Sequence, residues 1–197
     1  MPRGGNGTNS QGGVASRSPR GHGVKNFQGV LILFILAVGL PVVSAGAAKI
    51  PDDPGGFNGH AWGTPLAQFP AFKLVKDLGS TDFVKDIGVY ENPGEMLTLN
   101  EVRLTTIRYR FVENQLESVL LQYTGRENRD KLMQWLEERY GKLTSHERKM
   151  IGAILWYGDK TLINLKYDVV TQQGTLYFLS QALSNRFNEV HQGTQGD

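Results

Sequence analysis

The side chains that could carry out catalysis are spread along the chain without any local arrangement typical of an enzyme. The sequence has no cysteine, which excludes thiolate nucleophiles, disulfide bonds and cysteine metal ligands. It contains no Gly-x-Ser-x-Gly elbow, no phosphate-binding glycine loop that ends in Lys-Ser or Lys-Thr, and no helix motif with paired histidines for zinc. We therefore expect a non-enzymatic protein that holds no cofactor.

Histidines are too isolated in the sequence to predict a metal site. His60, His146 and His191 are the histidines after the N-terminal region, and none is spaced from another as a pair of metal ligands would be. A metal site assembled from histidines of distant segments would leave no such spacing in the sequence, and it stays open. His60 lies close to Trp62, which favours a role in a turn or in packing.

Carboxylates are plentiful, and they leave one enzymatic alternative open. A buried acid and base could come from separate strands without any sequence signature, which would suit a hydrolase of cell-envelope polymers. The adjacent pairs Glu137-Glu138 and Asp52-Asp53 are more typical of solvated charges, the first on a predicted helix and the second in a predicted linker.

Three arginines and one tryptophan are the candidate contact residues. Arg108 and Arg110 alternate along a predicted strand with Arg103 nearby, so they could form a basic strip on the open face of a sheet for an anionic ligand or an acidic partner. The other interpretation is an ordinary solvated face on which Arg110 pairs with Glu117 across strands. Trp62 is either a core anchor or a platform for a carbohydrate.

The first 47 residues predict export. Residues 1–23 are rich in Gly, Ser, Asn and Arg, and we interpret them as disordered or as upstream of the true start codon, with translation beginning at Val24. Residues 24–47 have the basic flank, the short apolar core and the small-residue exit of a signal peptide, with cleavage after Ala45 or Ala47. The apolar core is shorter than the roughly 20 residues that span a bilayer.

Removal of residues 1–47 changes the charge balance. The chain carries a net charge of +2, but residues 1–47 contain four basic side chains and no acidic one, so the remainder has 17 basic and 19 acidic side chains. This slightly negative balance argues against nucleic-acid binding, which needs a clustered positive face. We expect a periplasmic or secreted protein that meets a membrane only through the signal segment before cleavage.

The rest of the chain predicts one α+β domain over residues 55–184, after a linker at 48–54 and before a flexible tail at 185–197. Its helix is expected to begin at a capping box, Thr124 with Glu127, and to end at Gly141. A short N-terminal helical turn is expected from Pro65 to Pro70, with Thr64 as its N-cap. An antiparallel sheet should pack against the long helix. The buried stripe of that helix is predicted to consist of Leu132, Met133, Leu136 and Tyr140, with Trp135 at its margin.

The predicted strands cover residues 72–78, 85–91, 103–111, 115–123, 154–156, 161–167 and 175–182. Glu113-Asn114 is predicted to turn the chain so that Phe111 lies opposite Leu116, with a bulge near Ser118. Gly158-Asp159 is predicted to form a second two-residue turn. That turn would place Trp156 opposite Thr161 and Ile154 opposite Ile163.

Several of these motifs carry a resemblance. The opening Phe57-x-Gly59-x-x-Trp62-Gly63-Thr64-Pro65, the helix end Tyr140-Gly141 and the hairpin after Trp156 resemble a family of uncharacterised exported bacterial proteins over residues 55–182. More distantly, the chain is similar to the small lipoproteins of outer-membrane assembly. It lacks their lipidated cysteine, so membrane anchorage does not carry over. The resemblance implies an exported protein with a helix-plus-sheet architecture and supplies no catalytic residues to transfer. From the predicted export and the absence of catalytic motifs, we expect a binding module of the cell envelope, whose partner is an envelope protein or a small anionic ligand.

Overall fold

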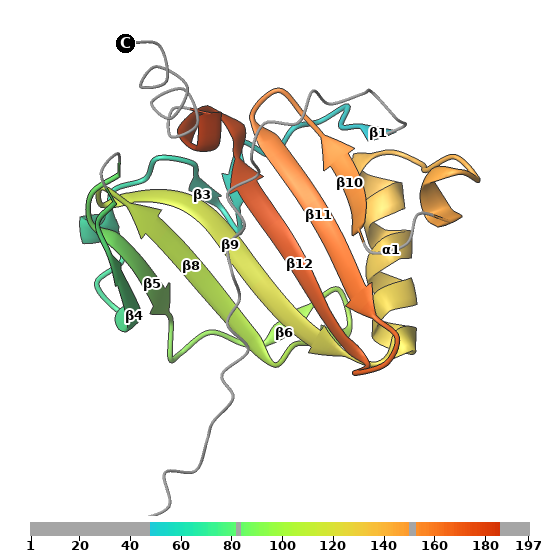
Figure 1. The fold of residues 1–197 in the computed structure, drawn as a ribbon, viewed down its shortest axis with the longest axis horizontal. Coiled ribbons are helices and arrows are strands. Elements are labelled where there is room, and N and C mark those ends of the chain that lie inside the picture. The colour runs from blue at the N-terminus through green and yellow to red at the C-terminus, as the bar shows by residue number, and fades with distance from the viewer. Residues whose placement is uncertain (1–47, 82–83, 150–152, 186–197) are drawn as a thin grey trace, which may run out of the picture. The chain divides into compact units, whose positions relative to one another are not determined.

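The computed structural model describes residues 48–81, 84–149 and 153–185. The predictions for residues 1–23, for the signal peptide at 24–47 and for nearly all of the tail at 185–197, His191 included, lie outside the described residues. Within the described part, the chain has the α+β architecture that the sequence predicts (Figure 1).

A largely antiparallel sheet of eight strands forms the body of this part of the chain, in the order β1-β10-β11-β12-β9-β8-β5-β4 (Figure 1). Only β1 and β10 run parallel. Two further pairs, β2 with β3 and β6 with β7, form small sheets of their own. The strands are β1 (Ala48–Lys49), β2 (Gly56–Phe57), β3 (His60–Ala61), β4 (Lys73–Gly79), β5 (Ile87–Glu91), β6 (Thr98–Leu99), β7 (Val102–Arg103), β8 (Thr106–Val112), β9 (Gln115–Thr124), β10 (Ala153–Tyr157), β11 (Thr161–Asp168) and β12 (Gln173–Ser180).

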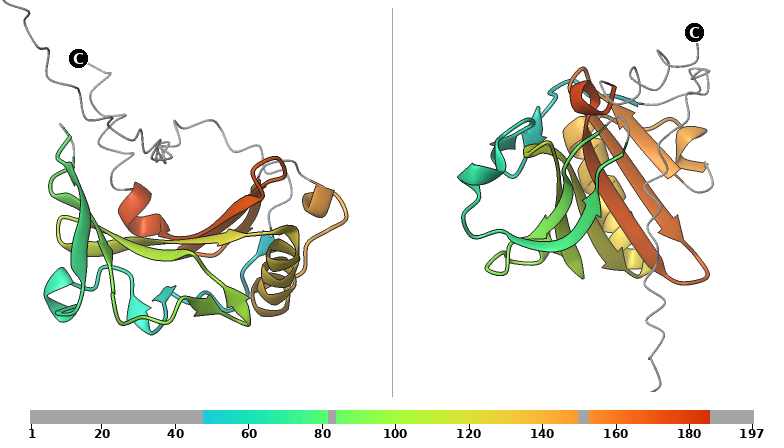
Figure 2. Two further views of the ribbon diagram at one scale, coloured as in Figure 1. Left: turned by 90° about the horizontal axis from the view of Figure 1, so that it is seen from below. Right: turned by 60° about the vertical axis from the view of Figure 1, so that its left-hand side comes forward.

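The long helix α1 (Arg126–Tyr140) packs on one face of the sheet, which β2, β3 and β6 also cover (Figure 2). Leu132, Leu136 and Tyr140 are buried as the helical spacing predicts. The predicted capping box is wrong: Thr124 is the last residue of β9, and Gly125 is the N-cap without any side-chain hydrogen bond. None of the helices among the described residues is long and apolar enough to cross a membrane.

The caps of α1 and of the short 3₁₀ helices differ in part from the predicted ones. Gly141 is the C-cap of α1 with a φ of 112°, a conformation that favours glycine. The predicted N-terminal turn is the 3₁₀ helix η1 (Leu66–Gln68), but its N-cap is Pro65. Thr64 does not cap it, because its hydroxyl donates to the carbonyl of Ala61 at 2.7 Å. A second 3₁₀ helix, η2 (Glu147–Lys149), follows α1, and the chain is helical again at residues 181–185.

The segment at 48–54 is part of the fold, which corrects its prediction as a linker. Ala48 and Lys49 form β1 beside β10, and the backbone N–H of Ile50 donates to the carbonyl of Tyr157 at 2.9 Å. Ile50 is 3 % exposed and belongs to the core. Asp53, predicted to be solvated, accepts hydrogen bonds from the backbone N–H groups of Gly55, Lys160 and Thr161. The local prolines suggested a linker, whereas pairing with a strand a hundred residues later fixes this segment.

The β8–β9 hairpin has the predicted turn and pairing. Glu113 and Asn114 connect the strands, and Phe111 lies opposite Leu116. The register then shifts so that Arg110 lies opposite Ser118, which makes Glu117 the extra residue of a bulge. The bulge is therefore one residue from its predicted place.

The β10–β11 hairpin keeps the predicted faces but has a different register. Trp156 lies opposite Ile163, and Ile154 lies opposite Leu165, two residues beyond the predicted partners. Because a shift of two residues preserves the alternation of a strand, the apolar side chains still share the core face. Trp156, Ile163 and Thr161 are fully buried there.

Candidate functional site

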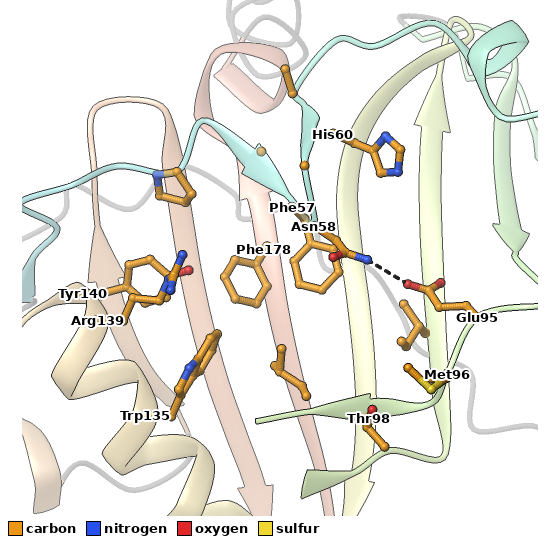
Figure 3. Close-up of a pocket in the computed structure, with 16 residues that line it drawn as sticks. Phe57, Asn58, His60, Glu95, Met96, Thr98, Trp135, Arg139, Tyr140 and Phe178 are labelled. Atoms are coloured by element: carbon orange, nitrogen blue, oxygen red, sulfur yellow. Dashed lines mark hydrogen bonds between the residues drawn. The ribbon is translucent and has the colours of Figure 1, made fainter. Parts of the chain in front are cut away.

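A cavity of about 790 Å³ lies on the helix side of the sheet. It is bordered by α1, by the β2–β3 hairpin and by the chain around β6, with the core face of the sheet beneath (Figure 3). The residues that line it are Pro54, Gly56, Phe57, Asn58, Gly59, His60, Ala61, Glu95, Met96, Thr98, Leu99, Ile107, Trp135, Arg139, Tyr140 and Phe178.

Aromatic rings form the floor of this pocket. The rings of Phe57 and Phe178 lie 5.0 Å apart between centroids, and Phe178 contacts Tyr140 edge to face at 6.2 Å. Phe57 also meets Tyr109 edge to face at 6.3 Å. These contacts join residues of β2, β12, α1 and β8, so the floor is a fixed apolar surface on which a flat or branched apolar group can pack.

Arg139 stands on the helix side of the pocket beside two rings. Its guanidinium carbon lies 6.0 Å from the centroid of Trp135 and 5.8 Å from that of Tyr140, which is the range of a cation–π contact. Burial raises the pKa of Tyr140, although Arg139 acts in the opposite direction. Arg139 is exposed, and no carboxylate of the described residues lies within ion-pairing distance of it.

Glu95 stands on the opposite side of the floor, in the loop before β6 (Figure 3). Its Oε1 accepts a hydrogen bond of 2.6 Å from the hydroxyl of Tyr109 and a longer one of 3.4 Å from the side-chain amide of Asn58. Burial raises the pKa of Tyr109, and the hydrogen bond to Glu95 raises it further, so this hydroxyl stays protonated and donates. Among the described residues, Glu95 has no cation within ion-pairing distance, and its Oε2 is buried without a donor.

The three predicted contact arginines do not line this pocket. Arg108 pairs with Glu91 at 2.9 Å, and Arg110, whose side chain is 14 % exposed, lies 3.4 Å from Glu117. Both arginines are on the sheet face opposite the core, as their alternation predicts. Arg103 is exposed on β7, which belongs to a separate small sheet. It is therefore not on the same sheet as Arg108 and Arg110.

Trp62, the fourth predicted contact residue, packs against the core, and its indole N–H donates to the hydroxyl of Thr161 at 2.9 Å. It is not among the residues that line the pocket. Of the two interpretations of Trp62, both contacts favour the core anchor over the carbohydrate platform, because they join the segment before η1 to the start of β11.

The carboxylates predicted to be solvated divide into two kinds. Glu138 is exposed as predicted. Glu137 instead accepts a hydrogen bond from the backbone N–H of Leu143 at 3.0 Å and forms an ion pair with Arg148 at 2.8 Å, which corrects its prediction as a solvated charge. Glu95 is the one carboxylate among the described lining residues. The ring of His60, which also lines the pocket, contacts the ring of Phe69 in a tilted arrangement with 4.6 Å between centroids. Within the described ranges, no three His, Asp or Glu side chains are grouped closely enough to hold a metal ion.

Glu95 and Arg139 were missed because neither belongs to a local motif. They are 44 positions apart in the sequence, and they reach one pocket only because α1 and the loop before β6 lie on the same face of the sheet. The available signal was Trp135, a large aromatic side chain at the margin of the buried stripe. It is partly buried and lines the cavity.

No family model, no curated protein and no solved structure matches the chain.

Proposed function

We propose that the protein is an exported, non-enzymatic binding module of the cell envelope, and that it takes a small ligand into the pocket between α1 and the β2–β3 hairpin. The observation that carries this proposal is the cavity of about 790 Å³ with an aromatic floor and separate charged side chains. Ligand sites in proteins occupy roughly 300–1,000 Å³ and combine apolar walls with a few polar groups.

Export is part of the proposal, and the strand boundaries are compatible with it. Cleavage after Ala45 or Ala47 would leave the whole sheet intact, because β1 begins at Ala48. The absence of cysteine suits a compartment in which stray thiols would oxidise. We place the protein in the periplasm or outside the cell, where its partner would be an envelope protein or a small ligand with an anionic group that Arg139 can bind.

The pocket favours binding over hydrolysis. A glycosidase-type mechanism needs two carboxyl groups about 5–10 Å apart at the scissile bond. Among the described residues that line the cavity, Glu95 alone supplies a carboxyl group, and it is already bonded to Tyr109 and Asn58.

A ligand screen on the purified full chain tests the binding role. Peptides, amino acids, sugars and fatty acids of the envelope are scanned by thermal shift and by tryptophan fluorescence, because Trp135 lines the pocket. Thr98→Trp should block the pocket, since Thr98 is exposed at its edge. Thr105→Trp, at an exposed position outside the lining residues, is the matched control.

We expect at least one ligand to bind the wild type and the Thr105→Trp variant but not the Thr98→Trp variant. A screen without any ligand, or a ligand that binds all three proteins equally, contradicts the proposed pocket. The compartment is tested separately by N-terminal sequencing of the protein from a periplasmic extract, where a chain that begins at Gly46 or Ala48 is expected. An intact chain in the cytosol contradicts export.

A further inference from the structure

The pocket holds two opposite charges that do not neutralise each other. Arg139 projects from α1 and Glu95 from the loop before β6, with Phe57 and Phe178 between them (Figure 3). Neither charge has an ion-pairing partner among the described residues. Elsewhere in the described chain, Arg126 and Arg108 do meet carboxylates, whereas the exposed Arg103 has none within ion-pairing distance among the described residues.

The Glu95 carboxylate is oriented to accept a further hydrogen bond. The short bond from Tyr109, at 2.6 Å, fixes the position of Oε1. The contact from Asn58 is 3.4 Å long and comes from an exposed side chain, so an incoming donor can replace it at small cost. An ammonium group is the donor that would also compensate the charge of a carboxylate whose second oxygen is buried.

The Arg139 guanidinium is held in place by packing. Its position beside the rings of Trp135 and Tyr140 restricts the side chain, and Tyr140 takes one of its hydrogen bonds. A guanidinium has five N–H donors, so others are left for another acceptor. A planar guanidinium binds a carboxylate through two parallel hydrogen bonds, which gives direction as well as attraction.

We infer that the ligand of this pocket is zwitterionic, specifically a short peptide with free ends and apolar side chains. Its ammonium group binds Glu95, its carboxylate binds Arg139, and its side chains pack on Phe57 and Phe178. This inference rests on the proposed function and names the ligand class for the same site. A ligand with a single charge would cover the other charged side chain without a partner, which is unfavourable.

The test compares a peptide with its capped forms. Isothermal titration of the full chain uses Leu-Phe, N-acetyl-Leu-Phe and Leu-Phe amide, and the same set built on Leu-Gly-Phe, because the span between the two charges sets the best length. On the wild type, the better of the two free peptides should bind about tenfold or more tightly than each of its capped forms, as the loss of one charge-assisted hydrogen bond requires.

Two variants test which side chain binds each end of the peptide. Glu95→Gln should remove the preference for the free amino end and keep the preference for the free carboxyl end, while Arg139→Gln should do the reverse. Glu138→Gln changes an exposed carboxylate on α1 outside the pocket lining and should change neither preference. Thermal unfolding of each variant verifies that it is folded, and the glutamine at position 95 can still accept from Tyr109.

The outcomes separate this inference from the proposed function. Capped peptides that bind as tightly as the free ones overturn the zwitterionic ligand and leave the binding role standing. If no peptide binds but another compound of the screen binds the pocket, the zwitterionic ligand is again overturned and the binding role stands. Failure of the whole screen overturns both.

Discussion

Two hairpins of the main sheet, β8–β9 and β10–β11, are built by different means. In the β8–β9 hairpin, Glu113 and Asn114 have φ values of 50° and 60°, the left-handed pair typical of a type I′ turn. In the β10–β11 hairpin, neither Asp159 nor Lys160 has a positive φ. The first turn has a backbone twist that matches its strands, although backbone groups of Leu66, Lys85 and Asp86 also bond to it. The second turn lacks that twist.

Distant side chains supply what the second turn lacks. The N–H groups of Lys160 and Thr161 both donate to the carboxylate of Asp53, and the side-chain amide of Gln181 donates to the carbonyl of Gly158. The groups that would close an ordinary turn are thus bonded to segments more than twenty residues away. The comparison shows that a hairpin register is readable from sequence when the turn's own backbone conformation fixes it, and is hidden when a distant side chain has to hold the turn.

The largest effect should come from the bulge of the β8–β9 hairpin. Glu117 is 2 % exposed, lies 3.4 Å from Arg110 and accepts from the hydroxyl of Ser184 at 3.1 Å. Removing one partner of a buried ion pair leaves a desolvated charge, so Glu117→Ala should lower the free energy of unfolding by about 3 kcal/mol. Urea denaturation measures it, with Glu138→Ala as an exposed control that should change it by less than about 0.5 kcal/mol.

An equally small loss in Glu117→Ala and in the control would mean that the bulge carboxylate contributes nothing. In that case the turn, and not the bulge, would be what stabilises the β8–β9 hairpin.

A smaller but still large effect is expected where the second hairpin meets its support. Asp53→Ala removes the acceptor of three backbone N–H groups, those of Gly55, Lys160 and Thr161. We expect a loss of about 2 kcal/mol in urea denaturation, in line with buried donors that lose their acceptor. Asp52→Ala is the matched control, because Asp52 is the exposed neighbour in sequence, and it should be neutral. Equal stability of the two variants would show that the turn needs no support.

The same support should depend on pH. Burial alone would raise the pKa of Asp53, but the hydrogen bonds from Thr161, Lys160 and Gly55 outweigh it and hold the pKa below its ordinary value. A depressed pKa means that the stabilisation is complete above about pH 4, the value in an unfolded chain, and is lost as the pH falls through the lower folded-state pKa. The difference in unfolding free energy between wild type and Asp53→Asn should therefore be constant from about pH 5 to 7 and shrink below about pH 4. A difference that grows on acidification contradicts this account.

This contrast also explains how far the sequence predicted the molecule. The α1 stripe, the strand alternation and the Glu113-Asn114 turn depend on neighbours in the sequence, and they were predicted correctly. The Trp156 register and the role of Asp53 depend on contacts across about a hundred residues, and they were not. The pocket belongs to the second kind, because Glu95 and Arg139 come from separate elements that only the packed fold brings to one cavity.

The smallest expected effects give the finest test of the comparison, because one substitution is made in both turns. Asn114→Gly places glycine where φ is 60°, which removes the strain of a left-handed side-chain residue and should raise the free energy of unfolding by about 0.5 kcal/mol. Lys160→Gly places it at an exposed position without a positive φ, so the added freedom of the unfolded chain should lower the free energy of unfolding by about 0.5–1 kcal/mol. Urea denaturation of the two variants should give opposite signs. Changes of the same sign would mean that the two turns do not differ in backbone conformation, and the comparison between the two hairpins would fail.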